Sequence, residues 1–172
     1  ISLGGVVAST SVKCAGNKID KAIAEYLRKT YGVSIGDQTA ENLKKTLCSA
    51  LAINPDVKSD VKGRDVVTGL PKTISIGTNE LVGAIDQELK QIVRAIKDVL
   101  GQIPPELASD IIDHGIVMSG GTSQLKNLDN LIAGQTGVSV RVADEPLFCV
   151  VNGTGVLLAH LGDYQRSILA KK

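Results

Sequence analysis

The sequence predicts an α/β fold, with a mixed sheet flanked by helices and a smaller inserted α+β lobe. Two observations carry this prediction. Towards the end of the chain, strand-like and helical segments alternate, which favours βαβ packing and a sheet covered on both faces. Residues 56–100 depart from that rhythm, because short β-like runs are followed there by one long helical stripe. We therefore expect that segment to belong to a second lobe inserted into the first.

The composition is that of an ordinary globular protein, since 43% of the 172 residues are apolar and 22% are charged. The net charge is +1 and both signs are interspersed, so no positive electrostatic potential is strong enough to attract nucleic acid. Only three tyrosines and one phenylalanine are available to stack on bases. We therefore expect no nucleic-acid partner. The three cysteines form no C-x-x-C pair, which fits reduced thiols in a cytoplasm. No apolar run is long enough to span a bilayer.

The first third of the chain predicts a hairpin and two helices. Alternating apolar residues around Gly4-Gly5 predict a β-hairpin, since glycine supplies the positive φ of a tight turn. The chain opens without Met inside this alternation, so we interpret it as a fragment. A first helix is expected over residues 19–31, with Gly32 as its C-terminal cap. A second helix is expected over about residues 42–51, opened by residues 39–41.

The middle of the chain predicts a small meander and the clearest helix. Residues 56–76 contain short apolar runs separated by turn residues, which is typical of short strands. Thr78 or Asn79 can cap the helix that follows. Its apolar residues hold one stripe as far as Leu100, so this helix should pack along its whole length.

The last third predicts alternating helices and strands. Residues 104–105 are both proline and begin a helix, since proline tolerates the first helical turn. Residues 115–119 form an apolar run short enough for a buried strand, and a helix carrying residues 125–132 follows. Residues 138–142 alternate as a second strand. A last helix, introduced by a proline, completes the pattern.

The strongest local candidate for a binding site is the glycine-rich bend made by Gly120, Gly121, Thr122 and Ser123. It follows a predicted strand and precedes a helix, where backbone can approach a ligand closely and free amides attract anionic or polar atoms. The alternative is that the two glycines only make the turn. Short glycine motifs often match by chance, so the motif alone does not decide between the two.

A second candidate is the charged face of the helix that follows residue 39. Glu41, Lys44, Lys45 and Cys48 are spaced i, i+3, i+4 and i+7, which places them on one face. A carboxylate and an ammonium there could hold two ribose hydroxyls, with Cys48 near a base. The alternative is an exposed Glu–Lys pair. Gly16, at another predicted strand-to-helix junction, is by itself only a turn.

The remaining motifs exclude several classes of site. His114 and His160 have no metal-ligating partners at usable spacing, so no metal site is predicted. Neither a G-x-S-x-G elbow nor a G-x-x-x-x-G-K-[ST] loop occurs, which removes the commonest hydrolase and P-loop interpretations. We assign no catalytic residue.

Motifs along nearly the whole chain resemble those of the MreB family of bacterial actin-like proteins, in the same order. They lie at residues 15–23, 39–45, 68–71, 104–112, 115–121, 144–147 and 152–155. The resemblance implies the fold shared by actin, heat-shock chaperones and sugar kinases, in which two lobes close over ATP or ADP with Mg²⁺. This chain resembles the second lobe of that actin-like ATPase fold. We expect residues 1–36 and 103–172 to form its larger subdomain, incomplete at the N-terminus, and residues 37–102 a smaller inserted subdomain.

The resemblance also implies which residues bind the nucleotide. The adenosine would lie between the glycine-rich bend and the ribose-side helix, so the expected binding residues are Gly16, Glu41, Lys44, Lys45, Gly120, Gly121, Thr122 and Ser123. Two positions depart from the family pattern. Thr122 stands where the family usually has a third glycine, which is actin-like. Asn17 stands where the family has Asp, which weakens a polar contact near the cleft, and we leave Asn17 out of the set.

The function implied for the parent protein is that of a cytoplasmic, ATP-dependent, filament-forming cytoskeletal protein. It would maintain rod shape by organising cell-wall synthesis, associating with itself and with membrane-bound synthesis machinery at the inner face of the membrane. The family's phosphate hairpins, its Mg²⁺-organising aspartate and its water-orienting acidic residue lie upstream of the position matching Ile1. Without donors for the β- and γ-phosphates, transition-state charge is not stabilised, so we expect no ATP hydrolysis by this fragment alone.

Three alternatives stay open at this point. A small-molecule kinase of the same superfold would carry its substrate residues in the missing half. A chaperone-type ATPase would be followed by a substrate-binding domain, which the short remainder after Leu161 disfavours. A degenerate actin-like scaffold would bind no nucleotide. The upstream sequence decides the first, and nucleotide affinity decides the last.

Overall fold

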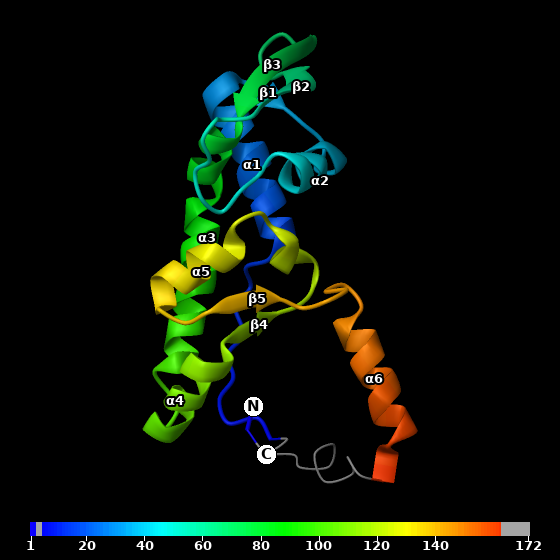
Figure 1. Ribbon diagram of the computed structural model, residues 1–172. Helices are drawn as coiled ribbons and strands as arrows, with labels where there is room; N and C mark the ends of the chain where they lie inside the picture. Colours follow the sequence, from blue (N-terminus) through cyan, green and yellow to red (C-terminus); the bar gives the residue numbers. More distant parts are fainter. Residues whose placement is uncertain (3–4, 163–172) are drawn as a thin grey trace.

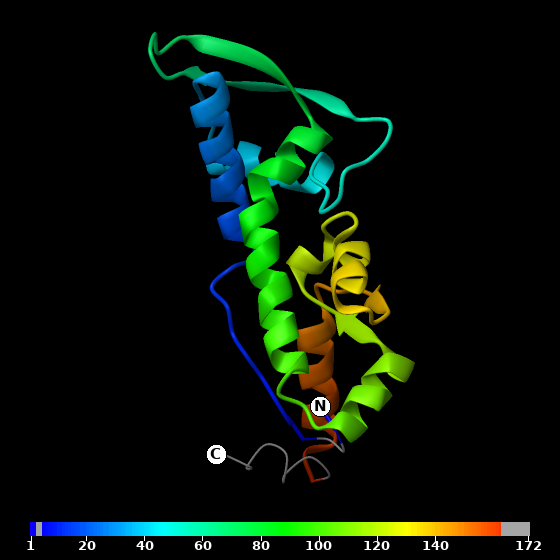
Figure 2. The same ribbon diagram turned by 90° about the vertical axis from the view of Figure 1, so that its left-hand side faces the viewer.

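A computed structural model of the chain describes residues 1–2 and 5–162 (Figure 1). The molecule is elongated, and its longest element, α3 (Thr78–Leu100), runs along one side. A three-stranded sheet lies at one end, and a two-stranded sheet lies near the middle (Figures 1 and 2). Helices α4 (Pro105–His114) and α6 (Cys149–Ala159) extend towards the other end, where the N-terminus also lies.

The first predicted helix is confirmed as α1 (Gly16–Tyr31). Ile19, Ile23 and Leu27 recur every fourth residue and are completely buried, which gives the helix one apolar face towards α2 and α3. The helix ends at Gly32, whose φ of 64° is the left-handed conformation that glycine adopts without strain.

The second predicted helix forms, but the expected bounds were wrong. Helix α2 (Asp37–Thr46) begins and ends five residues earlier than the 42–51 predicted from the leucine spacing. The carboxylate of Asp37 favours the earlier start, since a negative charge is stabilised at a helix N-terminus. After the helix, the chain turns aside to pair with a distant segment, as the amide of Ala50 donates to the carbonyl of Lys126 at 2.7 Å. Leu47, the next residue of the leucine period, is buried just after the helix ends, so the period extends past the helix.

The predicted meander is confirmed as an antiparallel sheet with strand order β1-β2-β3. Strand β2 (Lys58–Asp65) pairs with β3 (Pro71–Gly77), with Val61 opposite Ile74, and both side chains are buried. Strand β1 (Val33–Ser34) pairs with the end of β2 and was not predicted, because two residues carry no alternation.

The long helix α3 is confirmed, although its cap differs from the prediction. The N-cap is Gly77, and Thr78, expected as a cap, instead buries its hydroxyl and donates to the carbonyl of Leu47 at 2.9 Å. The capping acceptors are the carboxylate of Glu80, which binds the amide of Gly77, and that of Asp56, which binds the amide of Asn79. A Cβ on Gly77 would clash with the Asp56 carboxylate, which explains the glycine.

The start of α3 is tied to the end of α1 by a hydroxyl–carboxylate contact. Tyr31 donates its phenol to Glu80 Oε2, and this hydrogen bond is the main cause that raises the Tyr31 pKa to about 12. Because the folded pKa exceeds the ordinary value of 10.0, the unfolded chain loses the phenol proton first. The contribution of this contact to stability is therefore present below about pH 10 and is lost as the pH rises through about 12.

We accordingly expect the stability advantage of the wild type over Tyr31→Phe to shrink across that pH window. Thermal denaturation of both proteins at several alkaline pH values measures it. Because the two proteins contain the same lysines and other groups that titrate at alkaline pH, the effects of those groups cancel in the difference between the two melting temperatures. A difference in melting temperature that stays constant from pH 9 to pH 12 would contradict the proposed linkage.

The last third of the chain forms the predicted strand–helix–strand unit. Strands β4 (Ile116–Met118) and β5 (Val140–Val142) are parallel, and α5 (Leu128–Thr136) lies between them in sequence. The expectation of a sheet covered on both faces was wrong for the described residues. Ile116, Met118 and Val140 pack against the core, but Val117 points to the other face and is 51% exposed. A two-stranded sheet with α5 on one side leaves its second face open.

Helices α4 and α6 are both confirmed, and neither buries a residue. Helix α6 lies away from α3 and α5 in Figure 1, and its apolar side chains are mostly exposed, with Val150 at 76%. Among the described residues, no helix has both the length and the apolar character required to cross a membrane.

The predicted N-terminal hairpin was wrong in its extent. Ser2 and Gly5 form a single bridge, residues 3–4 lie outside the described residues, and residues 6–13 contain no strand. Val6 is 71% exposed. An alternating apolar pattern becomes a strand only where a second strand accepts its hydrogen bonds, and no described strand pairs with residues 6–13.

Candidate functional site

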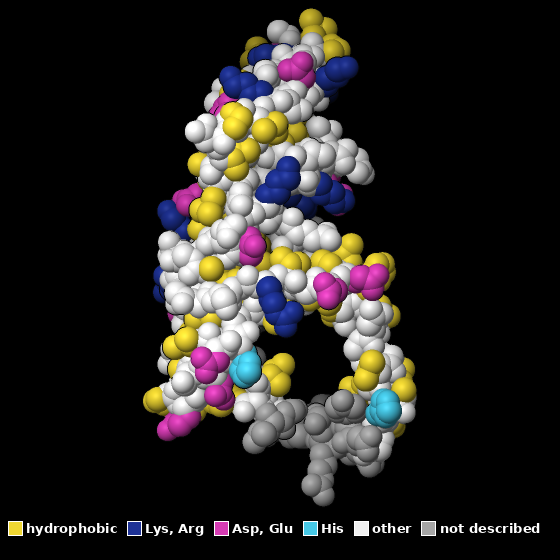
Figure 3. Space-filling view, in the orientation of Figure 1, with side chains coloured by type: hydrophobic (Ala, Val, Ile, Leu, Met, Phe, Trp, Pro, Cys, Tyr) yellow, Lys and Arg dark blue, Asp and Glu magenta, His cyan; other side chains and the backbone are white. Residues whose placement is uncertain are grey.

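A cleft of about 600 Å³ opens between the start of α1, one face of α2 and the bend that follows β4. In Figure 3 it lies in the hollow on the right-hand side below α2, where Lys and Arg side chains gather at the upper rim. Six of the eight residues expected from the sequence line this cleft: Gly16, Glu41, Lys44, Lys45, Gly121 and Thr122. Segments separated by almost 80 residues in the sequence therefore face one another, and the role of these residues in binding stays a prediction.

Gly16 forms the floor of the cleft at the first residue of α1. A Cβ at this position would lie 3.1 Å from the Nζ of Lys44 and 3.7 Å from the hydroxyl of Thr122. Any larger side chain would therefore enter the space between the two walls. Glycine leaves this space open to a ligand, and its φ does not lie in the left-handed region.

Lys44 reaches from α2 across to α1. Its ammonium lies 2.8 Å from Asp20 Oδ2 and donates to the carbonyl of Gly16 at 3.4 Å. The two charged side chains are only 16% and 15% exposed. The sequence placed Lys44 on one helix face with Glu41 but did not predict this ion pair, which joins Lys44 to a residue of the other helix.

Glu41 and Lys45 form a more exposed ion pair on the outer edge of the cleft. Their charged atoms are 2.7 Å apart, and the side chains are 40% and 61% exposed for Glu41 and Lys45 respectively. The hydrogen bond from Lys45, followed by its charge, lowers the pKa of Glu41. Glu41 is therefore an ionised acceptor at neutral pH, able to receive hydrogen bonds from a ligand's hydroxyl groups.

The glycine-rich bend presents two of its four predicted residues to the cleft. The 3-10 turn η1 (Gly121–Gln124) begins after Gly120, which has a φ of 86° and donates its amide to the carbonyl of Pro146 at 2.7 Å. Ser123 is buried, and its hydroxyl donates to the carbonyl of Gly120 at 2.6 Å. Gly120 and Ser123 thus hold the bend in shape and do not line the cleft, and their predicted role in nucleotide binding stays a prediction.

Comparison with known proteins identifies the family of this chain. The family model described as MreB/Mbl protein matches residues 1–166. The chain belongs to the MreB/Mbl family. It is 41% identical to the cell shape-determining protein Mbl of Bacillus subtilis (strain 168) over 164 residues and 43% identical to the cell shape-determining protein MreB of Escherichia coli (strain K12) over 158 residues. These alignments cover 94% and 92% of this chain but 48% and 46% of the relatives, so the chain spans about half of their length.

Solved structures show the actin-like fold of this MreB/Mbl chain. It superposes on MreB5 of Spiroplasma citri bound to AMPPNP with a TM-score of 0.90 at 32% identity, covering 98% of this chain and 51% of that one. The double helical filament of MamK gives a TM-score of 0.66 at 19% identity, covering 84% of this chain and 45% of that one, which supports the fold alone. The expected partial actin-like fold is confirmed, and the small-molecule kinase alternative is not favoured.

Cys48 of the MreB/Mbl chain, which the sequence placed on the same helix face as Glu41 and Lys44, does not line the cleft. Its side chain is completely buried, and burial, followed by the charge of Asp20, raises the pKa of its thiol to about 12. The residue follows the last turn of α2, where the chain has already turned towards the core. Cys48 is therefore a core residue with an inert thiol.

Sequence reasoning missed four residues that line the cleft and had set Asn17 aside. Three are apolar (Ile19, Leu125 and Leu147), and these, with Gln124 and Asn17, complete the wall. The apolar three follow the same helical and loop patterns as core residues, so periodicity does not separate them from the core. The available signal is the family resemblance, because Ile19 and Leu147 each lie within a family motif, at residues 15–23 and 144–147. In the structure, the Cδ2 of Leu147 lies 3.4 Å from where a Cβ on Gly121 would be.

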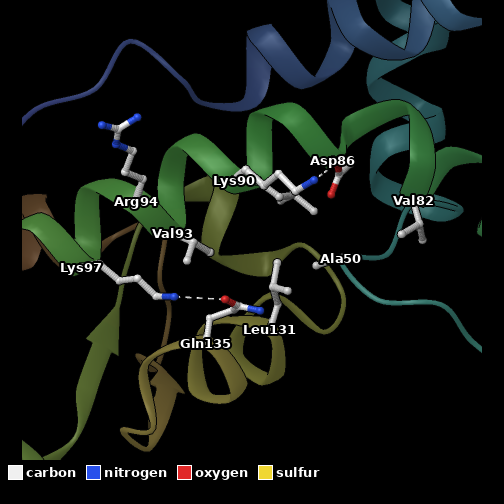
Figure 4. A pocket seen from close by; sticks show the side chains of 10 residues that line it. Ala50, Val82, Asp86, Lys90, Val93, Arg94, Lys97, Leu131 and Gln135 are labelled. Atoms are coloured by element: carbon white, nitrogen blue, oxygen red, sulfur yellow. Dashed lines mark hydrogen bonds and ion pairs between the residues drawn. The ribbon is translucent and has the colours of Figure 1, made fainter.

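A second hollow, of about 340 Å³, lies between α3 and α5 and contains none of the predicted site residues (Figure 4). Its lysines are already paired. Lys90 lies 2.7 Å from Asp86, and Lys97 donates to Gln135 at 3.1 Å. This hollow is a gap between two packed helices without glycine backbone for a close approach, so the larger cleft is the better candidate.

Proposed function

We propose that this chain supplies one wall of an adenine-nucleotide site in a filament-forming, actin-like protein that maintains rod shape by organising cell-wall synthesis. The observation that carries the proposal is the single cleft shared by the glycine-rich bend, α1 and the charged face of α2. Similar proteins support it, since relatives are named cell shape-determining proteins and MreB5 is bound to AMPPNP in one structure and to ADP in another.

The cleft offers each part of a nucleoside a fitting surface. The Glu41 carboxylate accepts and the Lys44 ammonium donates hydrogen bonds, which suits the two hydroxyls of a ribose. Leu125 and Leu147 form an apolar wall. A flat base that packs against this wall loses its contact with water and gains apolar contacts. The bend at Gly121 and Thr122 lets the backbone approach the ligand closely.

The phosphates and Mg²⁺ need residues beyond those described. Across residues 1–2 and 5–162, no three His, Cys, Asp or Glu side chains gather into a group that could hold a metal ion. When bound, Mg²⁺ neutralises charge that develops on the phosphates. We propose that the other half of the protein holds the metal and the β- and γ-phosphates, so this chain alone binds the adenosine end and does not hydrolyse ATP.

The proposed biological setting follows the relatives. Self-association into filaments is proposed because the chain belongs to the MreB/Mbl family, whose resemblance implies a filament-forming actin-like protein. We propose a cytoplasmic protein, peripheral at the inner face of the membrane, whose other partner is the cell-wall synthesis machinery. Within it, residues 37–102 would form the smaller subdomain, and residues 1–36 with 103–172 would form the larger one. Strand β1 belongs to the larger subdomain in this division but pairs with β2 of the smaller one.

Glu41→Ala and Lys44→Ala in the complete protein test the proposed site. Each should weaken ADP binding at least about tenfold, because each removes a charge-assisted hydrogen bond to the nucleoside. Isothermal calorimetry measures the affinity. Lys90→Ala is a matched control, since Lys90 belongs to an exposed i,i+4 ion pair on α3 outside the cleft. Unchanged affinity in both cleft variants would point to a scaffold that uses another site or none.

A further inference from the structure

The ion pair between Asp20 and Lys44 differs from the other ion pairs that the described residues form. Three of those, such as Glu25–Lys29, join residues four apart on one helix and leave both side chains at least 40% exposed. The fourth, Asp65–Lys72, closes the turn between β2 and β3. The Asp20–Lys44 pair instead joins α1 to α2, with both side chains about 85% buried. An exposed pair contributes little to stability or binding, whereas a buried pair fixes both side chains.

The pair also fixes where the Lys44 ammonium lies in the cleft. Asp20 is one helical turn after Gly16, so its carboxylate and the Gly16 carbonyl both face the incoming lysine. The ammonium lies 2.8 Å from Asp20 Oδ2 and 3.4 Å from the Gly16 oxygen. An ammonium has three donors. Two are directed at α1, and one is left for an acceptor on a ligand.

The second oxygen of Asp20 has no partner. Oδ1 is buried and accepts no hydrogen bond from the described residues. The charge of Asp20 also helps to raise the pKa of the nearby Cys48 thiol, which stays protonated. A buried acceptor without a partner costs stability, as does the desolvation of an ion pair. Packing alone would favour an apolar residue here. A carboxylate at this position is therefore better explained by what it does to Lys44.

We infer that Asp20 is a positioning residue for nucleotide binding: it holds the Lys44 ammonium at the cleft wall in the one orientation that meets the nucleoside. The inference rests on the proposed nucleotide site. Without Asp20, the flexible lysine side chain samples several rotamers, and a ligand must immobilise it on binding. The entropy of ordering one long side chain corresponds to a loss of ~3- to 10-fold in affinity.

A double-mutant cycle on ADP affinity in the complete protein tests this. Asp20→Asn keeps the shape of the side chain and removes its charge, and it should weaken ADP binding ~3- to 10-fold. Lys44→Met removes the ammonium and should weaken binding more. In the Lys44→Met background, Asp20→Asn should have no further effect, because no ammonium is left to position. Melting temperatures of all four proteins show whether each is folded.

The cycle separates the possible outcomes. An equal loss from Asp20→Asn with and without Lys44 would mean that Asp20 only supports the fold, and it would overturn the inference. So would unchanged affinity in Asp20→Asn when Lys44→Met is impaired, although the nucleotide site itself would then stand. Absence of ADP binding by the wild type would overturn the proposed function instead. If Asp20→Asn does not fold, Asp20→Glu, which moves the charge by one methylene, replaces it in the same cycle.

Discussion

Ile85→Ala is expected to lower the free energy of unfolding by about 2–5 kcal/mol. Ile85 lies in the middle of α3, is completely buried, and belongs to the core shared by α1, α2 and the three-stranded sheet. Truncation to alanine removes buried methyl groups and leaves a cavity that helices fixed on several sides cannot close. The cost therefore includes both the lost transfer energy and the empty space.

Denaturation of the complete protein by urea measures this effect. Ile112→Ala is the matched control, because it makes the same chemical change on α4 at a side chain that is 66% exposed. A change there should stay within about 0.5 kcal/mol. Equal losses in the two variants would contradict the place of Ile85 in the buried core.

The contrast between these isoleucines shows what the sequence can predict. The apolar stripe of α3 is visible because a helix repeats its buried face every turn, and Leu81, Ile85 and Leu89 are indeed buried. Strand β1 was missed because its two residues are strand only through pairing with β2. The opposite error occurred at residues 6–13, where the alternation is present and the partner strand is not. Local periodicity predicts which face is apolar, and pairing depends on the rest of the fold.

For the candidate site too, the sequence predicted some features, and others depend on contacts between distant segments. Spacing placed Glu41 and Lys44 on one helix face, and both line the cleft. Which charges pair was not visible, because Asp20 reaches Lys44 only through the packing of α1 on α2. The orientation of the bend was likewise set by contacts outside the motif, since the Gly120 amide binds the carbonyl of Pro146 and turns that end away from the cleft.

Gly16→Val is expected to weaken ADP binding on the order of 100-fold in the complete protein, or about 2.7 kcal/mol. The first atom of any side chain at this position would already lie 3.1 Å from the Lys44 ammonium and 3.7 Å from the Thr122 hydroxyl. The two methyl groups of valine must extend further into the same space, between the walls that would hold the nucleoside. They would displace Lys44 from Asp20 and narrow the cleft at the same time.

Gly83→Val provides the control for the glycine change itself. Gly83 lies in α3, and a Cβ there would meet no atom within 4 Å, so valine costs helix propensity without filling the cleft. Calorimetry with ADP should therefore detect a large loss for Gly16→Val and near wild-type binding for Gly83→Val, provided that both melt cooperatively. Wild-type affinity in Gly16→Val would mean that the nucleotide does not occupy the space between Lys44 and Thr122, because that space cannot hold a ribose and a valine side chain together.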